Sequence, residues 1–570
     1  MRALLALSGS VCVALMGLQD LSPGARASAA PQATSPGALR FENVTASAGL
    51  AGFHHTGGGS AEKWYIPEVM SGGVCADDLD ADGWTDIVLI NGGSFESAAG
   101  KTPPPPHGMF RNNGEGQFED VTAKTGIRNA GWGMGCAIAD YDADGDADIY
   151  ITNFLAPNQL WRNEGNWKFV DVAKDAGVGG AAHRWNMGAT FGDFDGDGLL
   201  DLFVAGYVRL DPANLPDPDR TPDCRHRGLV INCGPRGLKG ETDLLFRNAG
   251  NGRFSQVEAP IDPTAFYGLG AVFLPLGPNG AMELYVANDS TPNALFSFVK
   301  GRPRDHAIES GVALSEEGHE QAGMGIAWGD YDRDGRIDLF VTNFVDDYNT
   351  LYRSLADGLF EDVTRRMQLS QPTWVQMGWG TAFADFDRDG DDDLIVTNGH
   401  VYPQVDKLNL PSKWRMPMQA FINRDGRSFA ELSREALPGV AVGRGLALAD
   451  FWNDGRIGAV VNNLDGTPAL YRPVEPAGKY IELLLEGKTI RDATGALVRL
   501  RWEGGRTLRI VASGGSYLSS HDHRVHAGVG AASEVQGEIR WPGGDVQKIG
   551  PLKTNSRYRV RQGTAPVDLR

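Results

Sequence analysis

Clusters of four aspartates recur along this chain. The pattern D-x-D-x-D-G-x-x-D begins at Asp78, Asp140, Asp193, Asp330 and Asp385. Side chains at positions 1, 3, 5 and 9 can converge on one cation while the glycine at position 6 lets the loop turn. Hard carboxylate oxygens in a flexible loop suit Ca²⁺ better than Mg²⁺, which demands near-ideal octahedral geometry. The pattern predicts about five Ca²⁺ sites. The predicted ligands are Asp78, Asp80, Asp82, Asp86, Asp140, Asp142, Asp144, Asp148, Asp193, Asp195, Asp197, Asp201, Asp330, Asp332, Asp334, Asp338, Asp385, Asp387, Asp389 and Asp393.

Two other interpretations of the acidic pattern are weaker. An EF-hand needs a carboxylate at position 12, and all five copies have an apolar residue there. Solvated acidic turns are common, but five complete copies disfavour them. Two degenerate copies, PLGPNGAME from Pro275 and DFWNDGRIG from Asp450, lack several of the aspartates, so neither is expected to hold an ion.

The aspartate loops belong to a longer repeat. A glycine precedes the start of each of the seven copies by five residues, and the copies begin 53 to 82 residues apart. Each copy contains four strand-like segments, such as GCAIA, DIYITN, QLWRN and WKFVDVA around the second loop. A period of this length with four short strands is typical of a β-propeller blade.

The two ends of the repeat region complement each other. The last copy has its third strand at 469–473, but no fourth strand follows it in register. The missing piece, RFENVT at 40–45, precedes the first copy. We therefore predict an all-β fold: a seven-bladed β-propeller over residues 39–473, with an N-terminal strand closing the last blade, plus a small C-terminal β domain. The alternative is an open solenoid, which would leave sheet edges unpaired.

The N-terminus predicts export. Residues 1–29 read as a secretory signal peptide with a small-residue cleavage site at Ala27-Ser28-Ala29, and residues 30–38 as a linker. An uncleaved anchor helix is the alternative. No later stretch is long and apolar enough to span a bilayer. The net charge of −19 argues against nucleic-acid and anionic-membrane partners. The expected location is secreted or periplasmic.

The loops, with flanking G-x-A and DLYVTN-like strands, resemble FG-GAP/VCBS repeats, the propeller units of integrin α chains. Three later segments, DATGALVRLRWEGG (492–505), GGSYLSSHDHRVHAGVG (514–530) and IRWPGGDVQKIG (539–550), resemble an ASPIC/UnbV domain. Ser516 and Ala527 depart from that pattern, where glycine and phenylalanine are usual. With CGPRGLKGETDLLFRNAGNGRF (233–254), the chain resembles the bacterial type of the cartilage acidic protein-like family. The resemblance implies a calcium-bearing propeller, an ASPIC/UnbV-like domain at 474–563 and a tail at 564–570. It implies no settled activity.

Three smaller constellations give site hypotheses. Cys224 and Cys233 bracket a loop-like insert and are expected to form a disulfide, whereas Cys75 and Cys136 could pair or remain buried thiols. His521, His523 and His526 are interpreted as strand and turn residues, with a metal site as the alternative. Aromatic residues just before the innermost strands could form a ligand platform at one mouth of the channel, or only pack between blades. These aromatic residues are Trp132, Trp185, Tyr267 and Trp379.

The expected function is binding. A calcium-binding propeller outside the cytoplasm would recognise a cell-surface, matrix or envelope partner, either protein or glycan. The alternative is a polysaccharide-active enzyme or biosynthetic accessory protein that uses the channel mouth, because propellers host both kinds of function. A purely structural component is a third interpretation. No nucleophile elbow, HExxH motif or phosphate loop is found, so we name no catalytic residue, and enzymatic activity is the less favoured expectation.

Overall fold

The chain folds almost entirely into β-strands. The computed structural model describes residues 39–114, 116–221, 224–257, 266–355, 358–474 and 476–569. Within these ranges the α-helices are single turns: α1 (Phe95–Ala98), α2 (Thr122–Thr125), α3 (Ala173–Ala176), α4 (Ala307–Ser310) and α5 (Ser370–Thr373). The predicted signal peptide 1–29 and linker 30–38 lie outside the described residues. No helix in the described part of the chain is long and apolar enough to cross a membrane.

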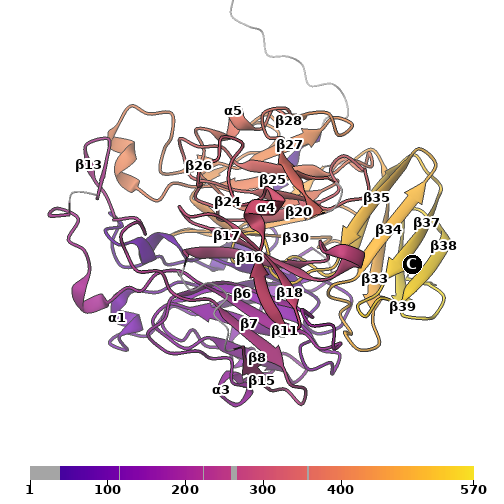
Figure 1. The fold of residues 1–570 in the computed structure, drawn as a ribbon, viewed down its shortest axis with the longest axis horizontal. Helices are drawn as coiled ribbons and strands as arrows, with labels where there is room; N and C mark the ends of the chain where they lie inside the picture. Colours follow the sequence, from indigo (N-terminus) through magenta and orange to yellow (C-terminus); the bar gives the residue numbers. More distant parts are fainter. Residues whose placement is uncertain are drawn as a thin grey trace, which may run out of the picture. The chain divides into compact units, whose positions relative to one another are not determined.

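Four-stranded antiparallel sheets repeat along residues 41–473 (Figure 1). The first strand of each, which we call the inner strand, pairs with the strand that follows the aspartate loop. This confirms four short strands per repeat. From inner to outer strand, the sheets are β2 (Val74–Asp77), β3 (Asp86–Leu89), β4 (Gly108–Asn112), β5 (Phe118–Asp120); β6 (Gly133–Ala139), β7 (Asp148–Asn153), β8 (Gln159–Asn163), β9 (Phe169–Asp171); β10 (Asn186–Gly192), β11 (Asp201–Gly206), β14 (Leu244–Asn248), β15 (Phe254–Gln256); β16 (Gly268–Leu274), β17 (Glu283–Asn288), β18 (Ala294–Val299), β19 (Arg302–Asp305); β20 (Ile326–Gly329), β21 (Asp338–Val341), β22 (Thr350–Ser354), β23 (Phe360–Asp362); β24 (Gly378–Ala384), β25 (Asp393–Asn398), β27 (Gln419–Asn423), β28 (Phe429–Glu431); and β30 (Gly443–Ala449), β31 (Gly458–Asn463), β32 (Ala469–Pro473), β1 (Phe41–Asn43).

The inner strands approach one another closely, and this explains the invariant glycine of the repeat. A Cβ atom on Gly325 would lie 2.0 Å from the carbonyl oxygen of Trp379, on the next inner strand. A Cβ atom on Gly188 would lie 2.4 Å from the carbonyl oxygen of Leu269. Inner strands contact each other in chain order from β2 to β30, and β30 in turn contacts β2. A side chain at the glycine position would force these neighbours apart.

The N-terminal strand completes the last sheet. β1 pairs antiparallel with β32, and Phe41, Glu42 and Asn43 lie opposite Pro473, Arg472 and Tyr471. The Phe41 ring is buried and packs edge-to-face on Phe386, with ring centroids 5.3 Å apart. The segment that the sequence assigned to the last sheet therefore forms its fourth strand.

Buried asparagines tie neighbouring sheets together. Asn163 ends β8, and its Nδ2 donates to the carbonyl oxygens of Ala147, in its own sheet, and Leu79, in the preceding loop, at 3.1 and 2.8 Å. Asn112 makes the same link across the ends of the repeat region, because its Nδ2 donates to the carbonyl oxygen of Phe451 at 2.8 Å. Asn248 and Asn423 repeat the arrangement.

We expect Asn163→Ala to lower the free energy of unfolding by about 1–3 kcal/mol, because two buried carbonyl groups lose their donor. Asn409→Ala, at an exposed loop position, is the control and should stay within about 0.5 kcal/mol of the unmodified protein. Urea unfolding in saturating calcium measures the free energy of unfolding of both variants. Equal stabilities of the two variants would contradict the linking role.

Two further sheets lie C-terminal to the repeats (yellow strands in Figure 1). Their buried residues, including Ile481, Leu483, Val498 and Trp541, form one hydrophobic cluster. Within residues 564–570, β40 (Val567–Asp568) pairs antiparallel with β39 (Ser556–Arg561). We call these strands the C-terminal sheets. They are β36 (Val525–Gly530), β33 (Lys479–Glu486), β39 (Ser556–Arg561) and β40; and β35 (Gly505–Ile510), β34 (Leu497–Trp502), β37 (Glu534–Arg540) and β38 (Val546–Lys553).

Both cysteine pairs are bonded. Cys224 is joined to Cys233, as expected, within the insert that carries β12 (Arg225–His226) and β13 (Leu229–Val230). Cys75 is joined to Cys136, a pairing that the sequence left open. The second bond links inner strands β2 and β6, 61 residues apart. It therefore fastens two neighbouring sheets to each other.

Candidate functional site

All five complete aspartate loops bring carboxylates together. In four of them the side chains at positions 1, 3 and 9 offer oxygens within 4.8 Å of one another, as in Asp78, Asp80 and Asp86. In the third loop the cluster is Asp193, Asp195 and Asp197, so position 5 replaces position 9. The remaining clusters are Asp140, Asp142 and Asp148; Asp330, Asp332 and Asp338; and Asp385, Asp387 and Asp393.

The aspartates at position 5 shape the loop. Asp82 Oδ1 accepts the backbone N–H of Trp84 at 3.0 Å, and the same bond recurs at Asp144, Asp197, Asp334 and Asp389. Asp201, the ninth residue of the third loop, accepts the N–H groups of Phe194 and Asn248. These predicted ligands therefore also hold the turn and the third strand.

Arginines on the third strand contact three of the loops, a feature that the sequence analysis missed. Arg111 Nε lies 2.6 Å from Asp80 Oδ2, and its Nη2 lies 2.7 Å from Asp82 Oδ2. Arg247 and Arg353 make equivalent pairs in the loops that begin at Asp193 and Asp330. The loops that begin at Asp140 and Asp385 differ: Arg162 pairs with Glu164, and Ile422 takes the arginine position. The arginine at the fourth position of these three strands, GMFRN, LLFRN and TLYRS, was the available signal.

The electrostatics of the clusters fit a bound cation. Burial raises the pKa of Asp86 to about 9 and that of Asp78 to about 7, and neighbouring carboxylates add to both shifts. Oδ1 of Asp80, Asp142 and Asp195 is buried without a hydrogen-bond partner among the described residues. A divalent cation would satisfy these oxygens and favour the ionised form of the carboxylates.

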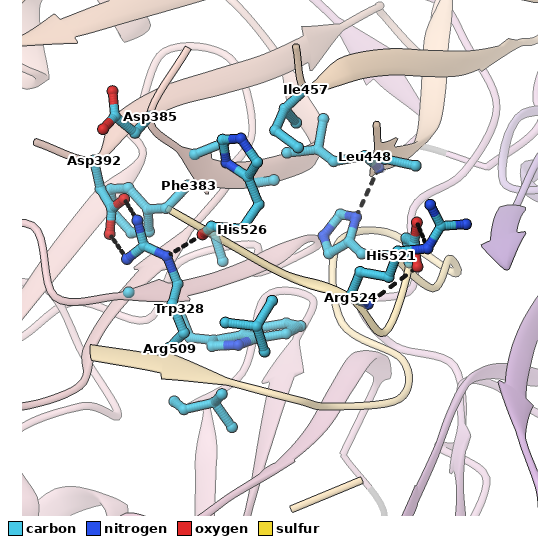
Figure 2. Close-up of a pocket in the computed structure, with 18 of the residues that line it drawn as sticks. Trp328, Phe383, Asp385, Asp392, Leu448, Ile457, Arg509, His521, Arg524 and His526 are labelled. Atoms are coloured by element: carbon cyan, nitrogen blue, oxygen red, sulfur yellow. Dashed lines mark hydrogen bonds and ion pairs between the residues drawn. The ribbon is translucent and has the colours of Figure 1, made fainter. Parts of the chain in front are cut away.

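The C-terminal sheets dock on the aspartate loops. Arg509 binds both carboxylate oxygens of Asp392, the eighth residue of its loop, at 2.6 and 2.8 Å (Figure 2). Asp492 Oδ2 accepts the backbone N–H of Asp140 at 2.9 Å. In the first loop Thr85 donates to Asp522 at 2.6 Å. Contacts to three different loops mean that loop geometry and C-terminal docking depend on each other.

The three histidines of SHDHRVHAG point to separate partners. His521 Nδ1 accepts the backbone N–H of Leu448, and His526 Nε2 bonds to the carbonyl oxygen of Gly455. His523 pairs with Asp77 at 2.5 Å. No metal cluster among the described residues contains a histidine. His526 lies in β36, and His521 and His523 lie in the segment that precedes this strand. His521 and His526 line a cavity of about 130 Å³ beside Arg509 (Figure 2).

A segment of the C-terminal region fills the space between the inner strands. Residues 513–520, which we call the central segment, are buried throughout. The backbones of Ser516 and Ile326 exchange two hydrogen bonds, at 2.8 and 2.9 Å. Leu518 O accepts the N–H of Cys136 at 3.1 Å. The central segment hydrogen-bonds to strands β2, β6, β10, β16, β20 and β24.

The aromatic residues near the channel are packed inward. Trp132, Trp185 and Trp379 are at most 1% exposed and belong to one hydrophobic cluster with Tyr517. The rings of Trp379 and Tyr517 lie 4.6 Å apart, and Tyr207 packs on Trp185. Trp132 and Trp185 therefore pack between neighbouring side chains, whereas Trp379 also lines a cavity. Tyr267 is partly exposed, and its hydroxyl donates to the carbonyl oxygen of Leu238.

A second, larger cavity lies where the insert meets the inner-strand ends. Its volume is about 1040 Å³. It is lined by Met70, Leu269, Met324, Met377 and Trp379, which are buried, and by residues of the insert around the Cys224–Cys233 disulfide. The sequence indicated a loop-like insert around Cys224 and Cys233 but could not place it over this cavity.

His400, close to that cavity, gives a pH prediction. Burial lowers its pKa from 6.5 to about 3, and its Nδ1 accepts the N–H groups of Val401 and Tyr402. Below pH 6.5 the unfolded chain takes up a proton that the folded chain refuses, so stability falls by about 1.4 kcal/mol per pH unit down to about pH 3. His400→Asn keeps an acceptor but does not titrate.

We therefore expect the stability of His400→Asn, relative to the unmodified protein, to improve by about 1.4 kcal/mol per pH unit between pH 6 and pH 4.5. Urea unfolding at constant free calcium measures it. The exposed His319→Asn is the control for replacing a histidine elsewhere in the chain. Parallel curves for His400→Asn and the unmodified protein would contradict the prediction.

Known protein families match parts of the repeat region and the C-terminal region of the chain. Residues 78–151, 150–204 and 330–396 match the FG-GAP-like repeat, and residues 486–567 match ASPIC and UnbV. Cartilage acidic protein 1 of mouse is 24% identical, covering 76% of this chain and 76% of the relative. The human protein is 24% identical, covering 72% and 69%. A solved lectin of Agrocybe aegerita, described as recognising non-reducing terminal N-acetylglucosamine, has 16% identity and a TM-score of 0.37, covering 70% of this chain and 86% of that one.

Proposed function

Because this chain carries FG-GAP repeats and an ASPIC/UnbV domain and is homologous to cartilage acidic protein 1, we propose that it is an exported calcium-binding protein that recognises a cell-surface, matrix or envelope partner. The fold proposed with it is a seven-bladed β-propeller over residues 39–473, followed by an ASPIC/UnbV-like domain from residue 474. The cyclic contacts of the inner strands and the pairing of β1 with β32 support that fold. The two disulfides support an oxidising compartment.

The aspartate clusters carry the calcium proposal. Carboxylates within 4.8 Å of one another, several with buried oxygens that lack a partner, need a positive charge. The residues that would hold the ions are those at positions 1, 3, 5 and 9 of the five complete loops. Bound calcium would supply the positive charge that these carboxylates need, in a structural role. The arginine contacts divide the loops into two groups, and those that begin at Asp140 and Asp385 keep more negative charge and should bind more tightly.

Calcium titration of the decalcified protein tests the metal proposal. We expect about five ions per chain by elemental analysis, with two tighter sites by calorimetry. Asp142→Asn should remove one tight site, and Asp80→Asn one weaker site. Glu309→Gln, at an exposed position, is the control. A calcium content of zero after equilibration in millimolar calcium would end the proposal.

Retention of a partner tests recognition. The calcium-loaded protein is incubated with fractionated envelope proteins and polysaccharides, and mass spectrometry records both what is retained and what is chemically changed. A partner retained unchanged and released by EGTA supports a binding protein. A polysaccharide that is cleaved would replace recognition with catalysis.

A further inference from the structure

The cavity of about 1040 Å³ beneath the insert has the features of a recognition site. Its volume is at the upper end of the roughly 300–1,000 Å³ range of ligand clefts. Its buried lining is apolar: Met70, Met324 and Met377 are at most 3% exposed and lie beside Leu269 and Trp379. A buried methionine surface accommodates apolar groups of varied shape.

The insert and the loops of the neighbouring sheets contribute polar residues of opposite charge to the lining of the cavity. The insert contributes the exposed guanidinium groups of Arg225 and Arg236. The loops of the neighbouring sheets contribute carboxylates, and Asp347 and Glu320 are two of them. Asp347 is oriented by Gln321, whose Nε2 donates to its Oδ1 at 2.8 Å. Cationic and anionic groups therefore border one apolar surface.

The fold rigidifies both the insert and the apolar lining. The Cys224–Cys233 bond constrains the insert, and Asn232 donates to the carbonyl oxygens of Lys63 and Val401 at 3.1 and 3.0 Å. The central segment supports the lining, because the Tyr517 ring packs on Trp379 and its hydroxyl donates to the carbonyl oxygen of Met70 at 2.5 Å. A preformed cavity lowers the entropy lost on binding.

We propose that this cavity binds a polypeptide segment of the partner, one that presents an apolar side chain between residues of opposite charge. This inference rests on the proposed recognition function and deepens it. The apolar side chain would occupy the methionine surface. An acidic residue would meet Arg225 and Arg236, and a basic residue would meet Asp347 and Glu320. A neutral glycan would leave these charges uncompensated.

Selection from a random heptapeptide library on the full calcium-loaded protein tests the ligand class. We expect enriched peptides with an apolar residue flanked by an acidic and a basic residue, and we measure their affinity by fluorescence anisotropy. Met324→Trp should fill part of the cavity, and Arg236→Glu should reverse one charge. Each is expected to weaken binding at least tenfold.

Lys239→Glu is the matched control for Arg236→Glu. Lys239 is exposed and three residues away but does not line the cavity. The affinity of the Lys239→Glu variant for the enriched peptides should stay within twofold of that of the unmodified protein. Circular dichroism checks that each variant is folded. Arg236→Glu changes an exposed position, so it still tests peptide binding if Met324→Trp does not fold.

Three results would overturn the inference. They are the absence of any enriched peptide, peptides that bind Arg236→Glu and Met324→Trp normally, and a glycan-array signal that Met324→Trp abolishes while no peptide binds. These differ from failure of the proposed function. If the native partner is retained equally by all variants, recognition stands and only this site is wrong.

Discussion

Removal of calcium with EGTA is expected to lower the stability of this protein by on the order of 10 kcal/mol. A site saturated at 100 times its dissociation constant contributes about 2.7 kcal/mol, so five independent sites contribute several times that amount. The emptied loops would retain clustered carboxylates, and burial already raises the pKa of Asp86 to about 9. Thermal unfolding followed by circular dichroism, with calcium and with EGTA, measures the difference.

The same treatment should release the central segment. Residues that flank this segment contact the loops, since Arg509 binds Asp392 and Asp492 binds the backbone of Asp140. In calcium, the amides of Gly515, Ser516 and Ser520 are bonded to inner-strand carbonyls and should exchange slowly. In EGTA we expect their exchange to accelerate at least tenfold, ahead of amides in the middle of β7.

Readdition of calcium is the control for this experiment, because it should restore both the unfolding temperature and the slow exchange. Magnesium at the same concentration should restore little. An unchanged unfolding temperature in a sample shown by elemental analysis to be metal-free would contradict a structural role for the ions. Accelerated exchange spread uniformly over all strands would contradict the specific link to the central segment.

The central segment also determines from which side a partner can reach the inner strands. The C-terminal sheets cover aspartate loops, and Leu518 and Tyr517 reach the hydrophobic cluster that contains Trp132 and Trp185. The large cavity lies against the same cluster, through Trp379 and Met70. One tyrosine therefore contacts the lining of the proposed recognition site, while its flanking residues connect to the loops. If the loops bind calcium and the cavity binds a partner, as proposed, we expect the two to be coupled through this segment.

Local patterns could be predicted from the sequence because each repeat supplies its own strands. The aspartate spacing located the carboxylate clusters, and RFENVT was placed in the last sheet. Contacts between repeats could not be predicted in this way. The donor–acceptor pair Asn163–Leu79 and the Cys75–Cys136 bond depend on how sheets stack. The segment GGSYLSS was matched only to the ASPIC/UnbV pattern, and its burial depends on tertiary packing that periodicity does not encode.

The aromatic residues illustrate a second limit. Position before an inner strand located Trp132 and Trp185 correctly at the strand ends, but position does not determine which way a ring points. Both indoles are buried because neighbouring large side chains, among them Phe154, cover them. Their environment depends on side chains from neighbouring repeats, which strand periodicity does not encode.

Phe41→Ala is expected to lower the free energy of unfolding by about 3–5 kcal/mol, although Phe41 lies close to the start of the described chain. Its ring is 3% exposed and packs on Phe386, in the aspartate loop that begins at Asp385. Phe360 occupies the same position in β23, as the first residue of the fourth strand, and is 7% exposed. Phe360→Ala is therefore the matched control, and urea unfolding in calcium compares the two variants.

Ring closure makes these two substitutions equivalent, whereas an open solenoid does not. If β1 is an essential fourth strand, Phe41→Ala and Phe360→Ala should have similar effects, and both should unfold in one cooperative transition. If β1 is a peripheral arm, Phe41→Ala should leave stability within about 1 kcal/mol while Phe360→Ala remains severe. A local strand cannot stabilise distant sheets unless the ring is continuous. The ratio of the two effects therefore measures closure directly, independently of calcium content and of any ligand.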